Sequence, residues 1–129
     1  IRVVQVMATG TNGGAQEHLY SLLIRMDQAR YDVSVVALSP GSAVRKLQRA
    51  GIPVLVIDEV DDAIAVGALA AHLSEVRADV VHAHWWIPAG LALPRGVPSV
   101  LTSHGTDAAL LRRSALARSR SRPAPPVTC

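Results

Sequence analysis

Residues 2–19 read RVVQVMATGTNGGAQEHL, and this stretch decides the fold. Its apolar first part is typical of a strand buried on both faces, and its last part begins an amphipathic helix. Glycines at positions 10, 13 and 14 lie between them. Such a turn leaves backbone N–H groups accessible at the positive end of a helix. It predicts a place for a phosphate or another oxygen-rich group. A turn that serves only close strand–helix packing is the alternative.

The rest of the chain repeats this order of strand and helix. Strands are predicted over residues 2–8, 32–38, 53–57, 79–83 and 98–103. Helices are predicted over 14–28, from a cap at Ser42 to Gly51, over 62–77 after a cap at Asp61 or Asp62, and over about 107–117, with a short helical or irregular stretch at 87–93. Regular βαβ alternation implies parallel strands with helices on both faces of the sheet. We therefore expect an α/β, Rossmann-like three-layer domain with strand order 3-2-1-4-5.

This strand order predicts where a ligand binds. Open α/β sheets bind ligands beyond the carboxyl ends of the strands, at the point where the strand order reverses. Here that point lies between the first and fourth strands. Three segments leave carboxyl ends near it, namely the glycine turn, residues 82–86 and residues 104–107. We expect these three segments to meet at one edge of the sheet.

Two histidines and two tryptophans end the fourth strand. His82 and His84 lie two residues apart and so face the same side of a strand. We expect one imidazole to pack beneath the adjacent loop and the other to line a cleft. A metal cluster with residues 104 and 107 is disfavoured, because the pair needs two further ligands in register. Trp85 suits stacking on a sugar or an acyl chain, or else it covers the end of the sheet.

The segment after the fifth strand holds the best candidate for chemistry. His104 precedes Gly105, which lets the backbone approach a ligand closely, and an imidazole exchanges protons at neutral pH. Asp107 either contacts the ligand or caps the following helix.

Composition bounds the class of protein. The 129 residues suffice for one domain, which we place at 1–113, before an Arg/Ser/Pro-rich tail at 114–129 that we expect to be disordered. The net charge of +3 depends on five arginines between Arg112 and Arg122, because residues 1–111 hold eight basic and ten acidic residues. The domain is therefore not a basic nucleic-acid binder. A single cysteine, Cys129, suits a reducing compartment. No apolar run is long enough to span a membrane.

Three motifs together resemble a known family. They are GGAQ at 13–16, ADVVHAH at 78–84 and GVPSVLTSHG at 96–105. Their order and spacing resemble the N-terminal domain of GT4-type glycosyltransferases of the GT-B fold, over about residues 1–111. A dinucleotide-binding oxidoreductase is a weaker match, since Leu38-Ser39-Pro40 follows the second strand where an acidic residue would be needed. A non-catalytic ligand-binding module is the other alternative.

The resemblance implies a function. Such enzymes have two Rossmann-like domains, one for the acceptor and one for the nucleotide-sugar donor, and they transfer the sugar with retention and normally without a metal or cofactor. It implies that Gly13 and Gly14 lie near the donor diphosphate and that His104 lies beside the transferred sugar. We expect Asn12, His84, Trp85 and Asp107 on the acceptor side.

The resemblance also has limits. The family's C-terminal donor domain is not among these residues, so we expect a truncated half that is inactive alone. The acceptor is expected to be a sugar or a lipid-linked molecule. The expected location is cytoplasmic, with a peripheral contact at the inner face of the membrane left open.

Overall fold

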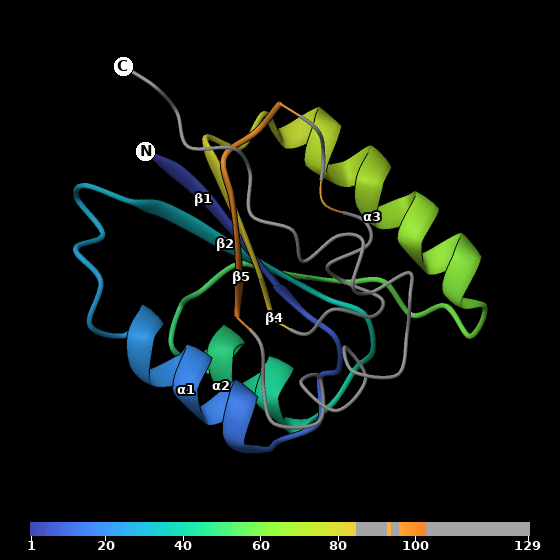
Figure 1. Cartoon of the computed structure of the whole chain (residues 1–129). Coiled ribbons are helices and arrows are strands. Elements are labelled where there is room, and N and C mark those ends of the chain that lie inside the picture. The colour runs from blue at the N-terminus through green and yellow to red at the C-terminus, as the bar shows by residue number, and fades with distance from the viewer. Residues whose placement is uncertain (85–92, 94–95, 103–129) are drawn as a thin grey trace.

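The computed structural model describes residues 1–84, 93 and 96–102 (Figure 1). These residues alternate strand and helix as the sequence predicted. The elements are, in order, β1 (Arg2–Met7), α1 (Gly14–Leu23), β2 (Asp32–Ala37), α2 (Ser42–Arg49), β3 (Val54–Val56), α3 (Asp62–Val76), β4 (Val80–His84) and β5 (Ser99–Thr102).

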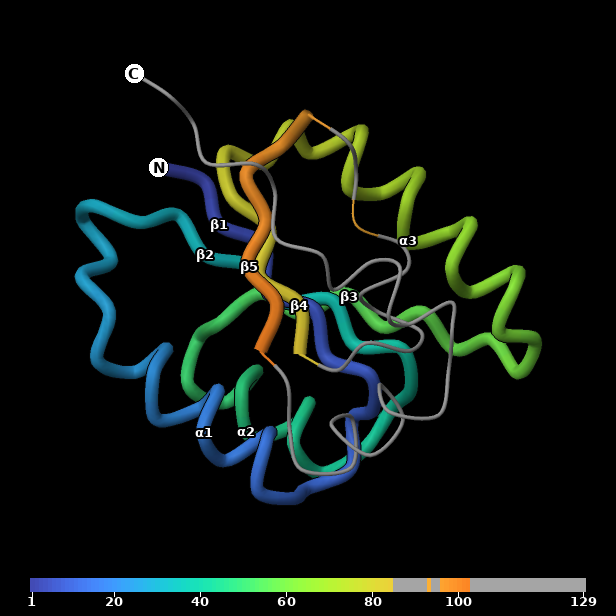
Figure 2. Tube along the Cα trace, viewed as in Figure 1, coloured from blue at the N-terminus to red at the C-terminus, as the bar shows by residue number. Residues whose placement is uncertain are grey.

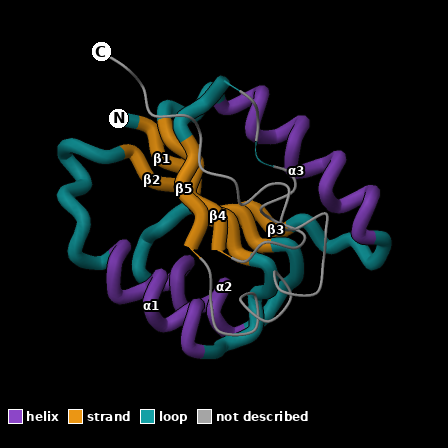
Figure 3. Tube along the Cα trace, in the orientation of Figure 1, coloured by secondary structure: helices purple, strands orange, loops and turns teal. Residues whose placement is uncertain are grey.

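The strands form one parallel sheet of five strands in the order β3-β2-β1-β4-β5 (Figure 3). This is the predicted order, and the α/β Rossmann-like class is confirmed. β1 lies between β2 and β4 at the centre of the sheet (Figure 2). Gln5 of β1 is in register with Val35 of β2 and with His82 of β4. The strand order reverses between β1 and β4, so the predicted switch point is present.

Helices cover both faces of the sheet, with α1 and α2 on one side and α3 on the other (Figure 1). Each face has its own apolar core. On the α3 side, Leu69 and Leu73 pack with strand residues such as Val4 and Val81. On the other side, Leu19 of α1 and Leu47 of α2 lie in a cluster with residues including Met7, Val35 and Ala37. Burial on both faces explains why the central strands are nearly continuous runs of valine.

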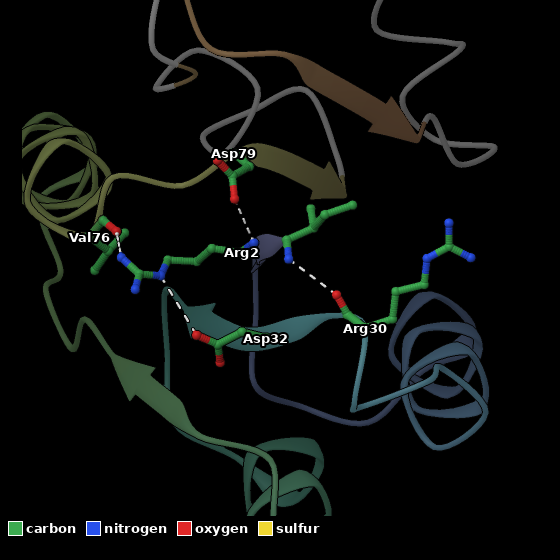
Figure 4. A network of polar contacts seen from close by, with 6 residues as sticks. Arg2, Arg30, Asp32, Val76 and Asp79 are labelled. Carbon is green, nitrogen blue, oxygen red and sulfur yellow. Dashed lines mark hydrogen bonds and ion pairs between the residues drawn. The ribbon is translucent and has the colours of Figure 1, made fainter.

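A polar network joins the amino ends of three strands (Figure 4). The backbone N–H of Arg2 donates to Asp79 at 2.7 Å, and its guanidinium donates to the Val76 carbonyl at 2.6 Å. The same guanidinium lies 3.6 Å from the Asp32 carboxylate, and the terminal ammonium of Ile1 donates to the Arg30 carbonyl. The network lies at the sheet edge opposite the glycine turn. We therefore interpret it as structural, because it ties the amino ends of the strands together away from the edge where ligands bind.

Two details of the helices differ from the prediction. α1 ends at Leu23 rather than at residue 28, because the chain tightens into i→i+3 bonds from Arg25 and Met26. Asp27 then accepts the N–H of Ala29 and closes a turn. The periodicity misled because Met26 still packs against the core beyond the helix. The predicted cap at Ser42 is also wrong, since Gly41 is the N-cap of α2.

Some predictions concern residues outside the described part of the chain. These are the stretch at 87–93 apart from Leu93, the last helix at 107–117 and the tail at 114–129. Within the part that is described, no helix is both long enough and apolar enough to cross a membrane.

Candidate functional site

The glycine turn leads directly into α1 at the carboxyl edge of the sheet. Gly13 is the N-cap of α1 and its carbonyl accepts the N–H of Glu17 at 2.9 Å. A glycine offers no side-chain oxygen to the first N–H groups of the helix. By contrast, α3 begins with Asp61, whose carboxylate accepts the N–H of Ile64 at 3.1 Å. The start of α1 therefore depends on another source of acceptors for its N–H groups.

Gly10 is needed for packing between two loops. A Cβ on Gly10 would overlap the Ser39 carbonyl oxygen, and a Cβ on Gly41 would overlap the Gly10 carbonyl. Two hydrogen bonds join the same loops, from the Gly10 N–H to Ser39 Oγ at 3.1 Å and from the Ala43 N–H to the Gly10 carbonyl at 2.9 Å. Gly10 therefore serves close packing, but between two loops and not between a strand and a helix as the alternative had it.

Gly13 and Gly14 have no comparable packing requirement. Among the described residues, nothing lies within 4 Å of a Cβ built on Gly14, and a Cβ on Gly13 would meet only the Gln16 Oε1, at 3.0 Å. The φ of Gly13 is −174°, an extended conformation that any residue adopts. Both glycines are exposed. Within the described part of the chain, neither packing nor backbone conformation requires glycine at positions 13 and 14. These glycines leave the N-terminus of α1 uncovered by side chains.

His84 lies behind this helix start. Its side chain is 2% exposed, and its Nε2 donates to the Gln5 Oε1 at 3.1 Å, since an amide oxygen only accepts. His84 also lines a small pocket with residues from the end of β1 and from α1, namely Met7, Ala8, Ala15, Gln16 and Leu19. His84 at the end of β4 therefore lies next to the residues on either side of the glycine turn.

His82 and His84 differ in burial and in their hydrogen-bond partners. His84 is buried, whereas His82 is half-buried and its Nε2 lies 2.7 Å from the Thr102 Oγ1 of β5. The two ring centroids are 4.3 Å apart. In this way side chains of β1, β4 and β5 are connected near their carboxyl ends.

An ion pair flanks the glycine turn. Lys46 of α2 donates to both carboxylate oxygens of Glu17, at 2.9 and 3.0 Å, and its ammonium lies 4.2 Å from the centroid of the Tyr20 ring. The hydrogen bond from Lys46 lowers the pKa of the Glu17 carboxyl, partial desolvation opposes this, and the side chain of Asn12 lowers the pKa further. Asn12 itself is exposed on the turn.

Three predicted site residues lie outside the described part of the chain: His104, Trp85 and Asp107. Their roles stay predictions. The described residues contain no group of three or more His, Cys, Asp or Glu side chains that could hold a metal ion.

Two functional candidates were missed by the sequence interpretation. Gln5 and Gln16 are both buried, at 2% and 7% exposure. Gln16 bonds the turn through the Thr9 carbonyl, and Gln5 bonds His84 from within β1. The available signal was a polar residue in the middle of an otherwise apolar strand, and a polar residue on the inward face of α1.

A larger cavity, of about 350 Å³, lies elsewhere. It is lined by residues near the amino ends of β2 and β3, such as Tyr31, Val33, Ile52 and Pro53. Because parallel α/β sheets bind ligands at the carboxyl edge, we place the site at the glycine turn despite the smaller pocket there.

Comparison with known proteins identifies the family. Residues 12–126 match the model of Glycosyltransferase Family 4. The chain belongs to this family. The resemblance inferred from the three motifs is thereby confirmed for this family 4 chain. A search of curated proteins found no match.

A solved structure is also similar to the family 4 chain. It is glycinamide ribonucleotide transformylase 1 from Symbiobacterium toebii, at 20% sequence identity and a TM-score of 0.44. The match covers 64% of this chain and 40% of that one, so the family 4 chain spans about two fifths of the length of that protein.

Proposed function

We propose that this family 4 chain is the acceptor-side domain of an enzyme that transfers a sugar from a nucleotide-sugar donor with retention. The observation that carries the proposal is the bare start of α1. Gly13 and Gly14 leave the helix N-terminus open where the described fold does not require glycine. N–H groups at a helix N-terminus bind a diphosphate through hydrogen bonds and the helix dipole.

The other predicted residues are assigned around this anion site. We propose that His104 lies beside the transferred sugar and that Asn12, Trp85 and Asp107 contact the acceptor, which is a sugar or a lipid-linked molecule. His84 belongs to the same side of the site. Its 2% exposure favours a place behind the surface rather than direct contact with the acceptor.

The proposed reaction needs a second domain. The donor's sugar and nucleotide would be bound by a Rossmann-like domain facing this one, and no metal or cofactor enters the proposed chemistry. The 129 residues alone would then bind a diphosphate weakly and turn over no nucleotide sugar. We propose a cytoplasmic enzyme, with a peripheral contact at the inner face of the membrane, and no nucleic-acid partner.

Binding of inorganic pyrophosphate tests the anion site. We expect pyrophosphate to shift the amide resonances of residues 13–15 in NMR spectra of the chain. Gly14→Ala places a methyl group over the site and should weaken this binding about tenfold or more. Gly67→Ala is the matched control, because a Cβ on Gly67 of α3 also meets nothing within 4 Å among the described residues. Equal affinities for both variants would contradict the proposal.

Turnover by the full-length enzyme tests the chemistry. His104→Ala should lower kcat by about 10²-fold or more if the imidazole acts at the reacting centre. A full-length protein that binds pyrophosphate but transfers no sugar would instead support a non-catalytic binding module.

A further inference from the structure

Three polar side chains in the described part of the chain are buried, and all three lie in one place. They are Gln5, Gln16 and His84. Burying a polar side chain costs free energy unless it is hydrogen-bonded, and a buried hydrogen-bonded network makes its surroundings rigid. Here they gather behind the glycine turn, between β1, β4 and the start of α1.

Gln16 holds the turn directly. Its Nε2 donates to the carbonyl oxygen of Thr9 at 3.2 Å, which links the first turn of α1 to the residue that follows β1 by two positions. Its Oε1 lies 3.0 Å from the place of a Cβ on Gly13. The amide therefore lies inside the turn and fixes the separation between its two ends.

Gln5 acts from further away. It lies in β1, in register with His82, and its Oε1 accepts the Nε2–H of His84. His84 in turn lines the small pocket that Ala15 and Gln16 of α1 also line. Gln5 is therefore linked through the imidazole of His84 to the first turn of α1, where the glycine turn ends.

We propose that Gln16 directly, and Gln5 through His84, are positioning residues that hold the glycine turn in its anion-binding shape. The inference rests on the proposed function in one respect, namely that the turn binds the diphosphate. Holding the turn in this shape favours binding through preorganisation. N–H groups whose directions are fixed beforehand lose less entropy on binding and reorganise less around the charge.

The two glutamines use different atoms, and this gives a sharp test. Gln5 uses its oxygen as an acceptor, whereas Gln16 uses its nitrogen as a donor. Glutamate has nearly the same shape and keeps only the acceptor. Both Glu variants add a buried charge, but Gln5→Glu keeps the acceptor for His84, whereas Gln16→Glu places a carboxylate against the Thr9 carbonyl oxygen. Gln5→Glu should therefore disturb the turn less than Gln16→Glu does. Gln5→Leu and Gln16→Met, which remove both polar atoms, should disturb it as well.

The primary readouts do not depend on any ligand. The imidazole ¹⁵N shifts of His84 should show the proton on Nε2 in the wild type and in Gln5→Glu, and a changed state in Gln5→Leu. The amide shifts of Gly13 and Gly14 should move in Gln5→Leu, Gln16→Met and Gln16→Glu. Pyrophosphate affinity should fall about fivefold in Gln5→Leu and Gln16→Met.

Two controls separate positioning from general loss of stability. Val4→Ala alters the same strand on the opposite face of the sheet, where Val4 is 0% exposed in the α3-side core. It should lower stability yet leave the amide shifts of the turn unchanged. Gln48→Met, at an exposed position on α2, should change neither the stability nor the amide shifts of the turn.

The outcomes distinguish this inference from the proposed function. If the wild-type chain does not bind pyrophosphate but the amide and ¹⁵N shifts respond as expected, the proposed anion site is wrong and the positioning of the turn stands. If pyrophosphate binds and Gln5→Leu and Gln16→Met leave both the turn shifts and the affinity unchanged, the positioning role is wrong. Equal effects of Gln5→Glu and Gln5→Leu would also overturn it.

Discussion

Gly10 and Gly14 lie four residues apart, yet a methyl group would meet very different surroundings at each. At Gly10 it would overlap the backbone of the loop after β2, which cannot move away as a flexible side chain can. Gly10→Ala should therefore lower the free energy of unfolding by about 1–3 kcal/mol or more, as overpacked sites do. Urea denaturation measures this change. Gly14→Ala is the comparison, and a similar loss in both variants would show that the two glycines are not different.

The roles of individual residues were the hardest feature to predict from the sequence. The strand–turn–helix pattern predicted that the glycines matter, but it could not separate Gly10 from Gly14. The distinction depends on Ser39 and Gly41, which are about thirty positions away and meet Gly10 only in the folded chain. Gln5 and Gln16 were missed for the same reason, since their value lies in partners that the local pattern does not reveal.

At the scale of elements, α1 and α2 are joined by the Glu17–Lys46 pair. Because the folded-state pKa of Glu17 is lowered by Lys46, the carboxylate stabilises the fold above the unfolded-state pKa, and this contribution disappears as the pH falls through the folded-state pKa. Glu17→Gln should therefore lower the unfolding midpoint at pH 7 and make little difference near pH 2. Thermal unfolding over this pH range measures the effect.

A matched variant keeps that test specific. Glu75→Gln alters an exposed carboxylate on α3 and is the matched control in the same thermal unfolding experiment. A wild-type minus Glu17→Gln difference that stayed constant from pH 7 to pH 2 would mean that the ion pair contributes nothing.

The start of α3 depends on a single cap. Asp61 accepts the N–H of Ile64, and the sequence predicted a cap at this position or the next. Asp61→Ala should lower the free energy of unfolding by about 0.5–2 kcal/mol, which is the usual effect of removing a capping side chain. Asp58→Ala, at an exposed position outside the helix, is the control in the same denaturation experiment. Equal stability of the Asp61 variant and the wild type would show that the cap is not needed.

Element types were easier to predict than element ends. Apolar strands and an inward face of leucines on α1 and α3 were visible because burial on a sheet imposes a period on the sequence. The end of α1 was not visible, because Met26 continues the apolar face while the backbone already turns at Asp27.

For the whole molecule, the order of the strands followed from the βα alternation and from right-handed crossovers. That order places the end of β4 next to β1, and His84 shares a small pocket with the residues on either side of the glycine turn. The third predicted segment, residues 104–107, lies outside the described part of the chain. Its place beside the other two segments therefore stays a prediction.

The two cores on opposite faces of the sheet should stabilise one cooperative unit. Val35 of β2 lies in the core on the α1/α2 side, Val81 of β4 lies in the core on the α3 side, and β1 separates the two strands. Each Val→Ala change removes two buried methyl groups and should lower the free energy of unfolding by about 1–3 kcal/mol. Because the two residues share neither a face nor a strand, the double variant should lose the sum of the two values to within about 0.5 kcal/mol. Urea denaturation followed by circular dichroism and by the NMR signals of both cores should give coincident single transitions. Two separate transitions would mean that the faces do not share one cooperative sheet. A loss well above or below the sum would mean that Val35 and Val81 are energetically coupled.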